Sequence, residues 1–169
     1  AFDFSVWEIW SALLYGGQLV IIPNKTRKNL EQLCDLIKKE QITILNQTPE
    51  AFQQLTQIDC HCDEKKFNSL RHIIFGGAAL LPKHISLWTE KYGLNQPELT
   101  NMFGITETTV HVTHHKITPQ DLLKSACPIG LPLDDLQIYL LDENLNIVPP
   151  GVVGMMYVGG PGVTRGYLN

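Results

Sequence analysis

The chain has 169 residues, of which 44% are hydrophobic and 18% are charged, the balance of a globular protein that buries a substantial core. Its net charge of −4 and its lack of any Lys/Arg block argue against a nucleic-acid partner. No apolar run reaches the roughly 18 residues that a membrane helix needs, so we expect no membrane partner either. The four cysteines lack the spacing of a disulfide framework, which favours a reducing, cytoplasmic compartment.

The first hundred residues alternate between helical and strand patterns. Ser5 and Glu8 have the spacing of a capping box, and the apolar residues after them recur at helical spacing until Gly16 and Gly17. This alternation predicts an α/β fold with a doubly wound, mostly parallel sheet that is covered on both faces. The elements predicted next are a strand over 18–22, a helix over 29–40, a strand over 42–45, a helix over 49–57, a surface loop over 59–68, a strand over 70–75, a helix over 81–92 and a strand over 99–103.

The pattern changes after about residue 115. From 129 onward Pro and Gly are frequent and helical periodicity disappears, while strands are predicted over 137–141 and 155–158 with a reversal between them. We therefore expect an α/β subdomain over 1–115, a connection over 116–128, and over 129–169 the start of a β-rich, distorted-barrel subdomain that is truncated. Because the sequence begins at Ala1 directly in an ordered-looking motif and stops just after another, we interpret it as an internal fragment of a longer chain.

Three segments follow predicted strands, at the edge where doubly wound sheets bind ligands. They cover residues 46–48, 76–79 and 101–109. The third combines an aromatic ring, a Gly, three hydroxyls and one carboxylate, groups that can stack on a base, donate to a phosphate and hold Mg²⁺. This composition indicates a nucleotide-phosphate site, although a polar loop whose Thr residues cap a following element fits the pattern equally well.

Three sequence motifs are spread along the chain in a fixed order: FDFSVWE at 2–8, NMFGITET at 101–108 and GGPGVTRGYL at 159–168. They are similar to the Phe-Asp-x-Ser-x-x-Glu, Asn-x-Tyr-Gly-Pro-Thr-Glu and Gly-x-Gly-x-Ala-Arg-Gly-Tyr motifs of adenylate-forming enzymes. The match is closest to the adenylation domains of non-ribosomal peptide synthetases. The stretch 130–145 is also typical of that family, so the resemblance covers the whole chain.

The resemblance implies an ATP-dependent reaction in two steps. A substrate carboxylate attacks the α-phosphate of ATP, which gives an acyl-adenylate and pyrophosphate, and the acyl group then moves to the phosphopantetheine thiol of a carrier protein. The implied cofactors are ATP, Mg²⁺ and phosphopantetheine. The implied partners are an amino acid together with the carrier-protein and condensation domains of the same synthetase.

The resemblance also assigns roles around the nucleotide. Asn101 would bond the adenine amino group, and Phe103 would stack on the ring where the family usually has Tyr. Thr106 would contact the α-phosphate, and Glu107 would bind Mg²⁺ and neutralise charge that develops during the displacement. Ile105 stands where Pro is usual. The residues expected along the nucleotide are Gly76, Gly77, Ala78, Asn101, Phe103, Gly104 and Thr106.

The amino-acid pocket can be located by the same resemblance. Asp3 would pair with the α-ammonium group of the substrate, which distinguishes amino-acid activators from fatty-acid or aryl-acid activators, although a helix N-cap is the alternative for an Asp at this place. In sequence order the implied lining residues resemble the threonine pattern of the family. They are Asp3, Phe4, Trp7, Asn46, Ile74, Gly76, Met102, Val110 and His111.

The chemistry of these side chains is compatible with threonine. Asn46 and His111 offer partners for one hydroxyl, and the apolar members close a small pocket. We therefore expect valine to be refused strongly and serine, which is one methyl smaller, only modestly. Without the family pattern, Trp7 and Met102 would be assigned to the core and His111 would be a buried histidine with a satisfied hydrogen bond.

Two groups of metal-type residues are not expected to bind a metal. The stretch 60–62 (CHC) has a one-residue spacing and no convincing second half, so a polar loop is the simpler interpretation. His111, His114 and His115 are close in sequence, but strand alternation would place His111 and His114 on opposite faces.

The sequence also departs from the family in ways that limit the prediction. Met155 stands where the family usually has Glu. The phosphate loop should lie upstream of these residues, and the ribose-binding acid, the hinge and the catalytic Lys should lie downstream, so we expect the isolated polypeptide to be inactive. An acyl- or aryl-acid ligase of the same superfamily is an alternative that Asp3 argues against. The intact Asn101, Thr106 and Glu107 argue against a non-catalytic remnant.

Overall fold

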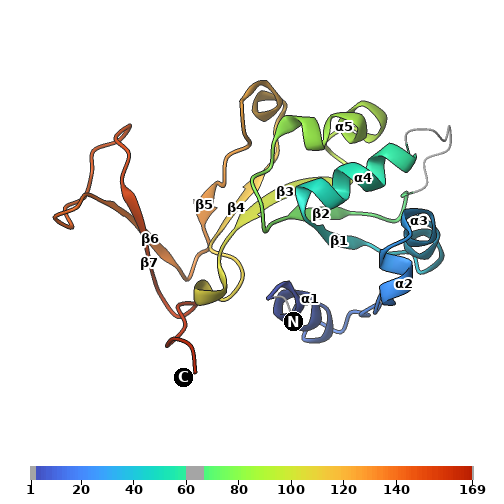
Figure 1. Ribbon diagram of the computed structural model, residues 1–169, viewed down its shortest axis with the longest axis horizontal. Helices are drawn as coiled ribbons and strands as arrows, with labels where there is room; N and C mark the ends of the chain where they lie inside the picture. The colour runs from blue at the N-terminus through green and yellow to red at the C-terminus, as the bar shows by residue number, and fades with distance from the viewer. Residues whose placement is uncertain (1–2, 60–66, 169) are drawn as a thin grey trace.

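The computed structural model describes residues 3–59 and 67–168, which form a five-stranded sheet with flanking helices and a two-stranded hairpin (Figure 1). Strands β1, β2 and β3 are parallel, whereas β4 and β5 join one edge of the sheet in antiparallel orientation. The predicted α/β fold is confirmed, and its parallel part is β1 to β3. The strands lie in the order β1 (Ile44–Gln47), β2 (His72–Phe75), β3 (Glu98–Phe103), β4 (Thr113–Lys116) and β5 (Leu131–Pro132).

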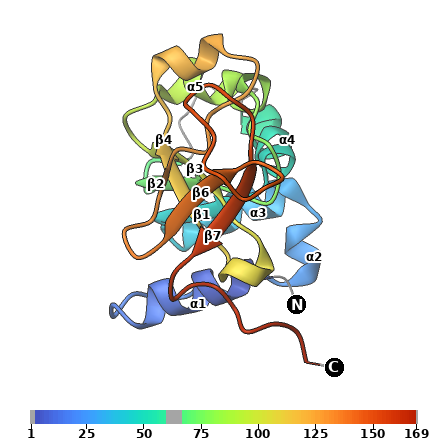
Figure 2. The same ribbon diagram turned by 90° about the vertical axis from the view of Figure 1, so that its left-hand side faces the viewer.

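The helices cover the sheet unequally. In both views α4 and α5 lie along one side of the sheet and α1 lies on the opposite side (Figures 1 and 2). The α-helices are α1 (Phe4–Leu13), α2 (Asn24–Arg27), α3 (Leu30–Lys39), α4 (Pro49–Asp59) and α5 (Ser86–Tyr92), and the 3₁₀ helices are η1 (Pro82–His84), η2 (Thr106–Thr108) and η3 (Pro119–Leu123).

A hydrophobic core joins the sheet to α3, α4 and α5. Phe52 of α4 meets Phe75 of β2 edge to face, with ring centroids 5.0 Å apart, and lies 5.1 Å from the ring of Trp88 in α5. These three side chains are fully buried, so α4 and α5 are fixed on the sheet by close aromatic packing. The same core contains Leu33, Ile37, Leu45, Leu55, Phe67, Leu70, Ile73, Leu80, Ile85 and Leu99.

Near the N-terminus the structure corrects two predictions. Helix α1 begins at Phe4, so Ser5 lies inside the helix and the predicted capping box with Glu8 is wrong. Residues 18–22 form no strand, because the described part of the chain gives them no neighbouring strand with which to pair. The short helix α2, which follows them, was not predicted.

The other elements of this half occur as predicted or with shifted bounds. The strand predicted over 42–45 runs instead from Ile44, because the N–H of Ile42 donates to the carbonyl of Ile37 (3.1 Å) and continues the end of α3. The helix predicted over 81–92 divides at Ile85, whose φ of −119° interrupts helical geometry between η1 and α5. Residues 60–66, which include most of the predicted surface loop, lie outside the described residues.

The C-terminal part is a hairpin of β6 (Gln137–Leu141) and β7 (Met155–Gly159), which projects from the five-stranded sheet (Figures 1 and 2). The predicted reversal between these strands is confirmed. The carboxylate of Asp142 accepts the N–H groups of Asn144 and Asn146 at 2.9 and 2.8 Å, which closes the turn. The five-stranded sheet continues through β5 to residue 132, and the division into 1–115, 116–128 and 129–169 stays a prediction.

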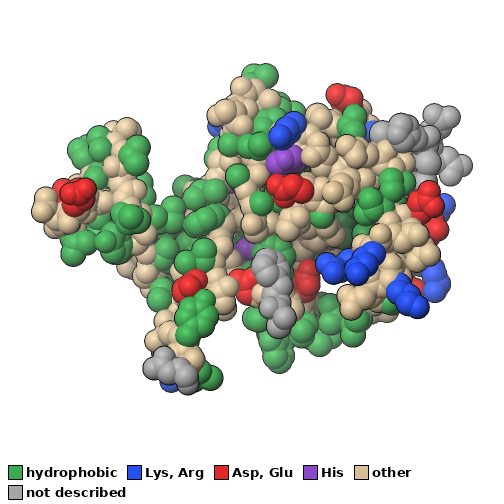
Figure 3. Space-filling model, in the orientation of Figure 1, with side chains coloured by type: hydrophobic (Ala, Val, Ile, Leu, Met, Phe, Trp, Pro, Cys, Tyr) green, Lys and Arg blue, Asp and Glu red, His purple; other side chains and the backbone are tan. Residues whose placement is uncertain are grey.

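Helix α1 differs from α3 and α4 because none of its residues is buried. Trp10 and Leu13 expose 54% and 52% of their surfaces, and hydrophobic atoms line the lower edge of the molecule, where α1 lies (Figure 3). Within residues 3–59 and 67–168, no helix is long and apolar enough to cross a membrane. Phe4, Trp7 and Glu8, in the N-terminal half of α1, contact residues outside the helix.

Candidate functional site

The N-terminal end of α1 lies against loops that follow β2 and β3. The hydroxyl of Thr106, just after β3, donates to Oδ2 of Asp3 at 2.8 Å. A Cβ on Gly76, which follows β2, would lie only 2.6 Å from Cζ of Phe4, so only Gly lets this ring approach the strand end. These contacts bring α1 to the carboxyl ends of parallel strands, which is where open α/β sheets bind ligands.

Asp3 occupies the N-cap position of α1, but its carboxylate does not act as a cap. No hydrogen bond joins that side chain to the first turn of the helix. The carboxylate accepts the Thr106 hydroxyl instead, so a negative charge is directed toward the loop after β3. The N-cap alternative therefore does not explain why an Asp stands at this position.

His111 joins two aromatic residues of α1. Its ring centroid lies 5.6 Å from that of Phe4 and 5.2 Å from that of Trp7, the second pair nearly perpendicular at 82°. The His111 side chain also lies beside Gly76, since a Cβ there would come within 3.4 Å of its Cε1. The structure thus brings together four of the residues that the sequence assigns to the amino-acid pocket.

Three buried polar atoms at this place lack a hydrogen-bond partner among the described residues. They are Nε1 of Trp7, Oδ1 of Asn46 and Nδ1 of His111. Buried polar groups are nearly always paired, because an unpaired one costs about 1–3 kcal/mol. A polar ligand that enters between α1 and the strand ends would pair these atoms.

Burial shifts the pKa values of His111 and Glu8, the two titratable side chains next to Trp7 and Asn46. Burial lowers the pKa of His111 to about 4, although the nearby carboxylate of Asp3 acts in the opposite direction. His111 is therefore neutral at pH 7. Burial likewise raises the pKa of Glu8, which the hydrogen bond from Asn46 partly offsets. The neutral His111 ring, the Trp7 indole and the Asn46 amide thus offer uncharged hydrogen-bonding groups near the carboxylate of Asp3.

The remaining pocket candidates are apolar. Ile74 is the cross-strand neighbour of Asn46 on β2, and Met102 and Val110 are buried. Val110 has a φ of 75°, which is unusual for a β-branched residue and costs about 1–3 kcal/mol. Gly104 permits this path, because a Cβ there would lie 2.0 Å from the carbonyl oxygen of Val110. The chain after β3 therefore folds back tightly and returns residues 110 and 111 to the sheet.

Asn101 and Phe103 occupy the end of β3 in different environments. Asn101 is 3% exposed, and its Nδ2 donates to the carbonyl of Pro128 at 2.8 Å, which fixes the amide. Phe103 exposes 36% of its surface, so part of its ring is open to solvent. A fixed amide and an open ring on neighbouring parts of one strand fit the polar edge and the flat face of a nucleobase.

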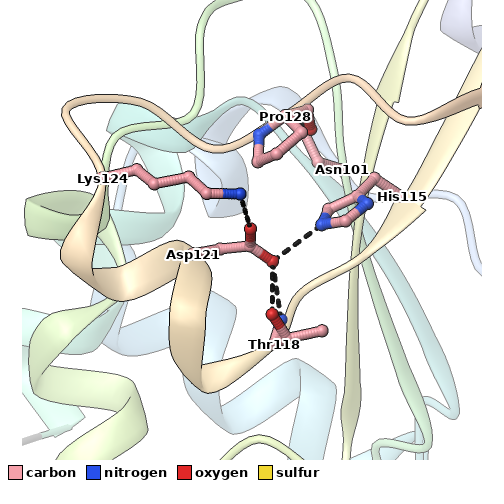
Figure 4. A network of polar contacts seen from close by, with 6 residues as sticks. All are labelled: Asn101, His115, Thr118, Asp121, Lys124 and Pro128. Atoms are coloured by element: carbon pink, nitrogen blue, oxygen red, sulfur yellow. Dashed lines mark hydrogen bonds and ion pairs between the residues drawn. The ribbon is translucent and has the colours of Figure 1, made fainter.

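A buried carboxylate supports the sheet beside Asn101 (Figure 4). Oδ2 of Asp121 accepts the N–H and the hydroxyl of Thr118 at 2.9 and 2.8 Å and lies 2.7 Å from Nε2 of His115. Nζ of Lys124 pairs with Oδ1 at 2.8 Å. Burial alone would raise the pKa of Asp121, but the hydrogen bonds from these three side chains outweigh it and hold that pKa far below its usual range. His115 is the cross-strand partner of Asn101, so the network anchors β4 next to it.

Thr106 and Glu107 begin η2 and are exposed. Oε1 of Glu107 accepts the hydroxyl of Tyr167 at 2.9 Å, a bond that raises the pKa of Tyr167. Mg²⁺ commonly takes one or two carboxylates and completes its shell with water and substrate phosphates. An exposed carboxylate next to a hydroxyl fits that need, so Glu107 could hold the ion that the family implies.

The other expected nucleotide residues lie at the same edge. Gly77 and Ala78 are exposed directly after β2, and the φ of 79° at Gly77 favours Gly there. In the described ranges no three His, Cys, Asp or Glu side chains gather as metal ligands, and residues 60–62 lie outside those ranges. His111 precedes β4, so the argument from strand alternation does not apply to it. It is buried beside α1, whereas His115 faces Asp121.

Two residues of the site received no role from the sequence, although both stand inside the quoted motifs. Glu8 contacts Asn46, and Tyr167 contacts Glu107. The N–H of Thr164 also donates to the Glu107 carbonyl at 2.8 Å, which brings the third motif against the second. Membership in a motif was the available signal, but the partner of each side chain depends on the fold.

Comparison with known proteins gives related sequences over the whole chain. The signature of the AMP-binding enzyme family matches residues 1–168. Malpinin synthetase from Mortierella alpina is 48% identical over 169 residues, which are 100% of this chain and 2% of that protein. The dimodular nonribosomal peptide synthase of Bacillus subtilis (strain 168) is 48% identical over 171 residues, 100% of this chain and 7% of that protein. The chain therefore spans a small part of these relatives.

Solved structures share the fold. A nonribosomal peptide synthetase protein that contains adenylation and PCP domains, PA1221, matches with a TM-score of 0.84 and 28% identity, over 98% of this chain and 32% of its own. The α-methyl-L-serine-AMP bound form of FmoA3 matches with a TM-score of 0.90 and 25% identity, over 99% of this chain and 19% of its own. The arrangement of strands and helices described above is thus that of adenylation domain structures.

Proposed function

The chain belongs to the AMP-binding enzyme family, and on that premise we propose that it is the part of an adenylation domain that selects and activates an amino acid in non-ribosomal peptide synthesis. The relatives extend far beyond the matched segment, so the proposal concerns the full-length protein that carries these residues. Carrier-protein and condensation domains are the proposed partners, and the adenylation and PCP domains of PA1221 support the first of them. The isolated 169-residue polypeptide is expected to be inactive.

The observation that carries the proposal is the set of polar groups between α1 and the ends of the strands. These are the carboxylate of Asp3, which is not used as a helix cap, and three buried polar atoms of Trp7, Asn46 and His111 that have no partner among the described residues. A carboxylate beside an otherwise aromatic pocket suits the α-ammonium group of an amino acid, because the two opposite charges attract and form a charge-assisted hydrogen bond. A fatty or aryl acid offers no group for Asp3.

In the proposed reaction the side chains mainly bind the amino acid and ATP and orient them toward each other. Oδ1 of Asp3 accepts the substrate ammonium while Thr106 occupies Oδ2, which turns the substrate carboxylate toward η2. Asn101 and Phe103 hold adenine by its polar edge and its face. The carboxylate oxygen bonds to the α-phosphorus as the bond to pyrophosphate breaks. Mg²⁺ held by Glu107 would neutralise charge on the phosphates.

Threonine is the proposed substrate. Neutral His111, the Asn46 amide and the Trp7 indole supply both donors and acceptors for one side-chain hydroxyl. Ile74, Met102 and Val110 would enclose the methyl group. The FmoA3 structure, whose bound adenylate is α-methyl-L-serine-AMP, supports a hydroxyl-bearing amino acid on this scaffold.

Amino-acid-dependent exchange of pyrophosphate into ATP tests the proposal on the full-length protein. Threonine is expected to drive exchange best, serine less by roughly 10- to 100-fold, and valine still less because it leaves the polar atoms unpaired. Exchange driven by a fatty or aryl acid would replace this proposal by the related ligase, and no exchange with any acid would indicate a non-catalytic module. Exchange driven best by an amino acid without a hydroxyl would remove threonine but keep amino-acid activation.

A further inference from the structure

The side-chain amide of Asn46 is bound at one end only. Its Nδ2 donates to Oε1 of Glu8 at 3.4 Å, across the contact between β1 and α1. The opposite end, Oδ1, is buried and has no hydrogen-bond partner among the described residues. The amide therefore presents an unused acceptor on the side away from Glu8.

Glu8 is suited to hold this orientation because an ionised carboxylate contains acceptors only. It can bind the NH₂ end of Asn46 but not the oxygen end. If the amide were reversed, two acceptors would meet and the contact would be lost. Glu8 is also half-buried on the helix that carries Asp3 and Trp7, so the same element positions the substrate ammonium site and the Asn46 amide.

We propose that Glu8 is a specificity-determining residue that acts through Asn46: it keeps Oδ1 of Asn46 available as an acceptor for a hydroxyl on the bound amino acid. The inference rests on the proposed amino-acid activation and extends it, because Glu8 is not among the expected pocket residues. A threonine side chain donates to this acceptor. Valine has nearly the same shape but leaves Oδ1 unpaired, so the Glu8–Asn46 contact favours threonine over valine.

The proposal is tested by the ratio of kcat/KM for threonine to kcat/KM for valine, measured by pyrophosphate exchange on the full-length protein. Glu8→Met keeps the length of the side chain but removes the acceptor, so the Asn46 amide is free to turn. The ratio is expected to fall about 10-fold, the value of one hydrogen bond that discriminates between substrates. Glu8→Gln retains an acceptor oxygen but adds an NH₂ donor that can pair with the reversed amide, so its ratio is expected to fall between those of Glu8→Met and the wild type.

A double-mutant cycle shows whether Glu8 acts through Asn46. Asn46→Leu is expected to lower the same ratio, and adding Glu8→Met to it should cause no further change. Glu90→Met, on the exposed surface of α5, is the matched control and should leave the ratio unchanged. Thermal melting checks that each variant folds, and Glu8→Ala provides a second test of the missing acceptor if Glu8→Met does not.

The outcomes separate this inference from the proposed function. If Glu8→Met or Glu8→Ala lowers kcat/KM for threonine and valine by the same factor, Glu8 only stabilises the fold and the inference is overturned. A further fall of the ratio in the Asn46→Leu background would also overturn it. A wild-type protein that shows no exchange, or that activates valine as well as threonine, would overturn both the inference and the proposed threonine selectivity.

Discussion

The two sides of the five-stranded sheet differ in how closely their side chains pack and in how many polar contacts they make. On one side, Phe52 and Trp88 are fully buried and pack closely onto Phe75. On the other side, no residue of α1 is buried, and the contacts at its N-terminal end include the bond from Thr106 to the N-cap residue Asp3, the bond from Asn46 to Glu8 and two ring contacts with His111. The first side has the close packing of a stable core, whereas the second has the polar atoms and open geometry of a ligand site.

The distribution of unpaired polar atoms sharpens this contrast. Of the five buried side-chain polar atoms without a partner among the described residues, three belong to Trp7, Asn46 and His111. The other two belong to Asp59 and Trp88, and the second oxygen of Asp59 is paired with Lys91 at 3.0 Å. Unpaired groups are therefore concentrated where α1 meets the strand ends, and substitutions on the two sides should affect different measurements.

The largest effect on activity is expected from Asp3→Ala. Loss of the carboxylate leaves the substrate ammonium without its counter-charge, so kcat/KM for amino-acid-dependent exchange should fall roughly 100-fold or more. The free energy of unfolding should fall by no more than about 1 kcal/mol, because the Asp3 side chain makes no capping bond and its hydrogen bond from Thr106 is exposed. Asp134→Ala, at an exposed carboxylate, serves as the control. Full exchange activity in Asp3→Ala would leave Asp3 without a role in substrate binding.

Phe52→Ala is the converse change on the packed side. Removing a fully buried ring that contacts Phe75 and Trp88 should cost about 3–5 kcal/mol of the free energy of unfolding. The KM for the amino acid should stay within about twofold in the fraction that remains folded, because Phe52 has no contact with α1 in its ring pairs. Urea titration followed by pulse proteolysis of the full-length protein measures the first quantity. A loss below about 1 kcal/mol would contradict the assignment of this side as the main core.

The sequence predicted the packed side better than the ligand side. Helix α3 was recognised because Leu33 and Ile37 follow a helical period that burial enforces, and α4 because Pro49 favours the start of a helix. The strand expected over 18–22 did not form, because a strand depends on a partner that local sequence cannot specify. Helical periodicity was visible in α1 as well, yet it did not reveal that the helix is unburied.

The site residues were named from motifs, but their neighbours were not predictable. Nothing local in the sequence indicates that Thr106 meets Asp3 across 103 positions, or that Asn46 meets Glu8 across 38. After β3 the chain folds back toward the sheet, a path that depends on Gly104 and on the positive φ at Val110. The sequence did not predict this path either. Family motifs give the identity of such residues, whereas the fold decides which atoms face one another.

The smallest expected effect concerns the titration of His111, which connects binding with stability. Burial lowers its pKa to about 4 from about 6.5. The unfolded chain therefore binds a proton that the folded protein excludes between these values, so acidification from pH 6.5 to pH 4 should progressively reduce stability. Well above pH 6.5 the imidazole is neutral in both states and its contribution to the pH dependence of stability disappears.

Comparison of the wild type with His111→Gln over pH 4 to 8 measures this contribution. The wild type should lose more stability than the variant as the pH falls from 6.5 to 4, and the two should run parallel from pH 7 to 8. The pair Asp3→Ala and Asp3→Ala/His111→Gln refines the result, because the Asp3 carboxylate raises the pKa of His111. Without that carboxylate the pKa of His111 should drop further. The loss of stability that His111 causes on acidification should then extend to lower pH. If the wild type and His111→Gln lose the same stability between pH 6.5 and pH 4, the pKa of His111 is not lowered in the folded protein and the pocket is open to water.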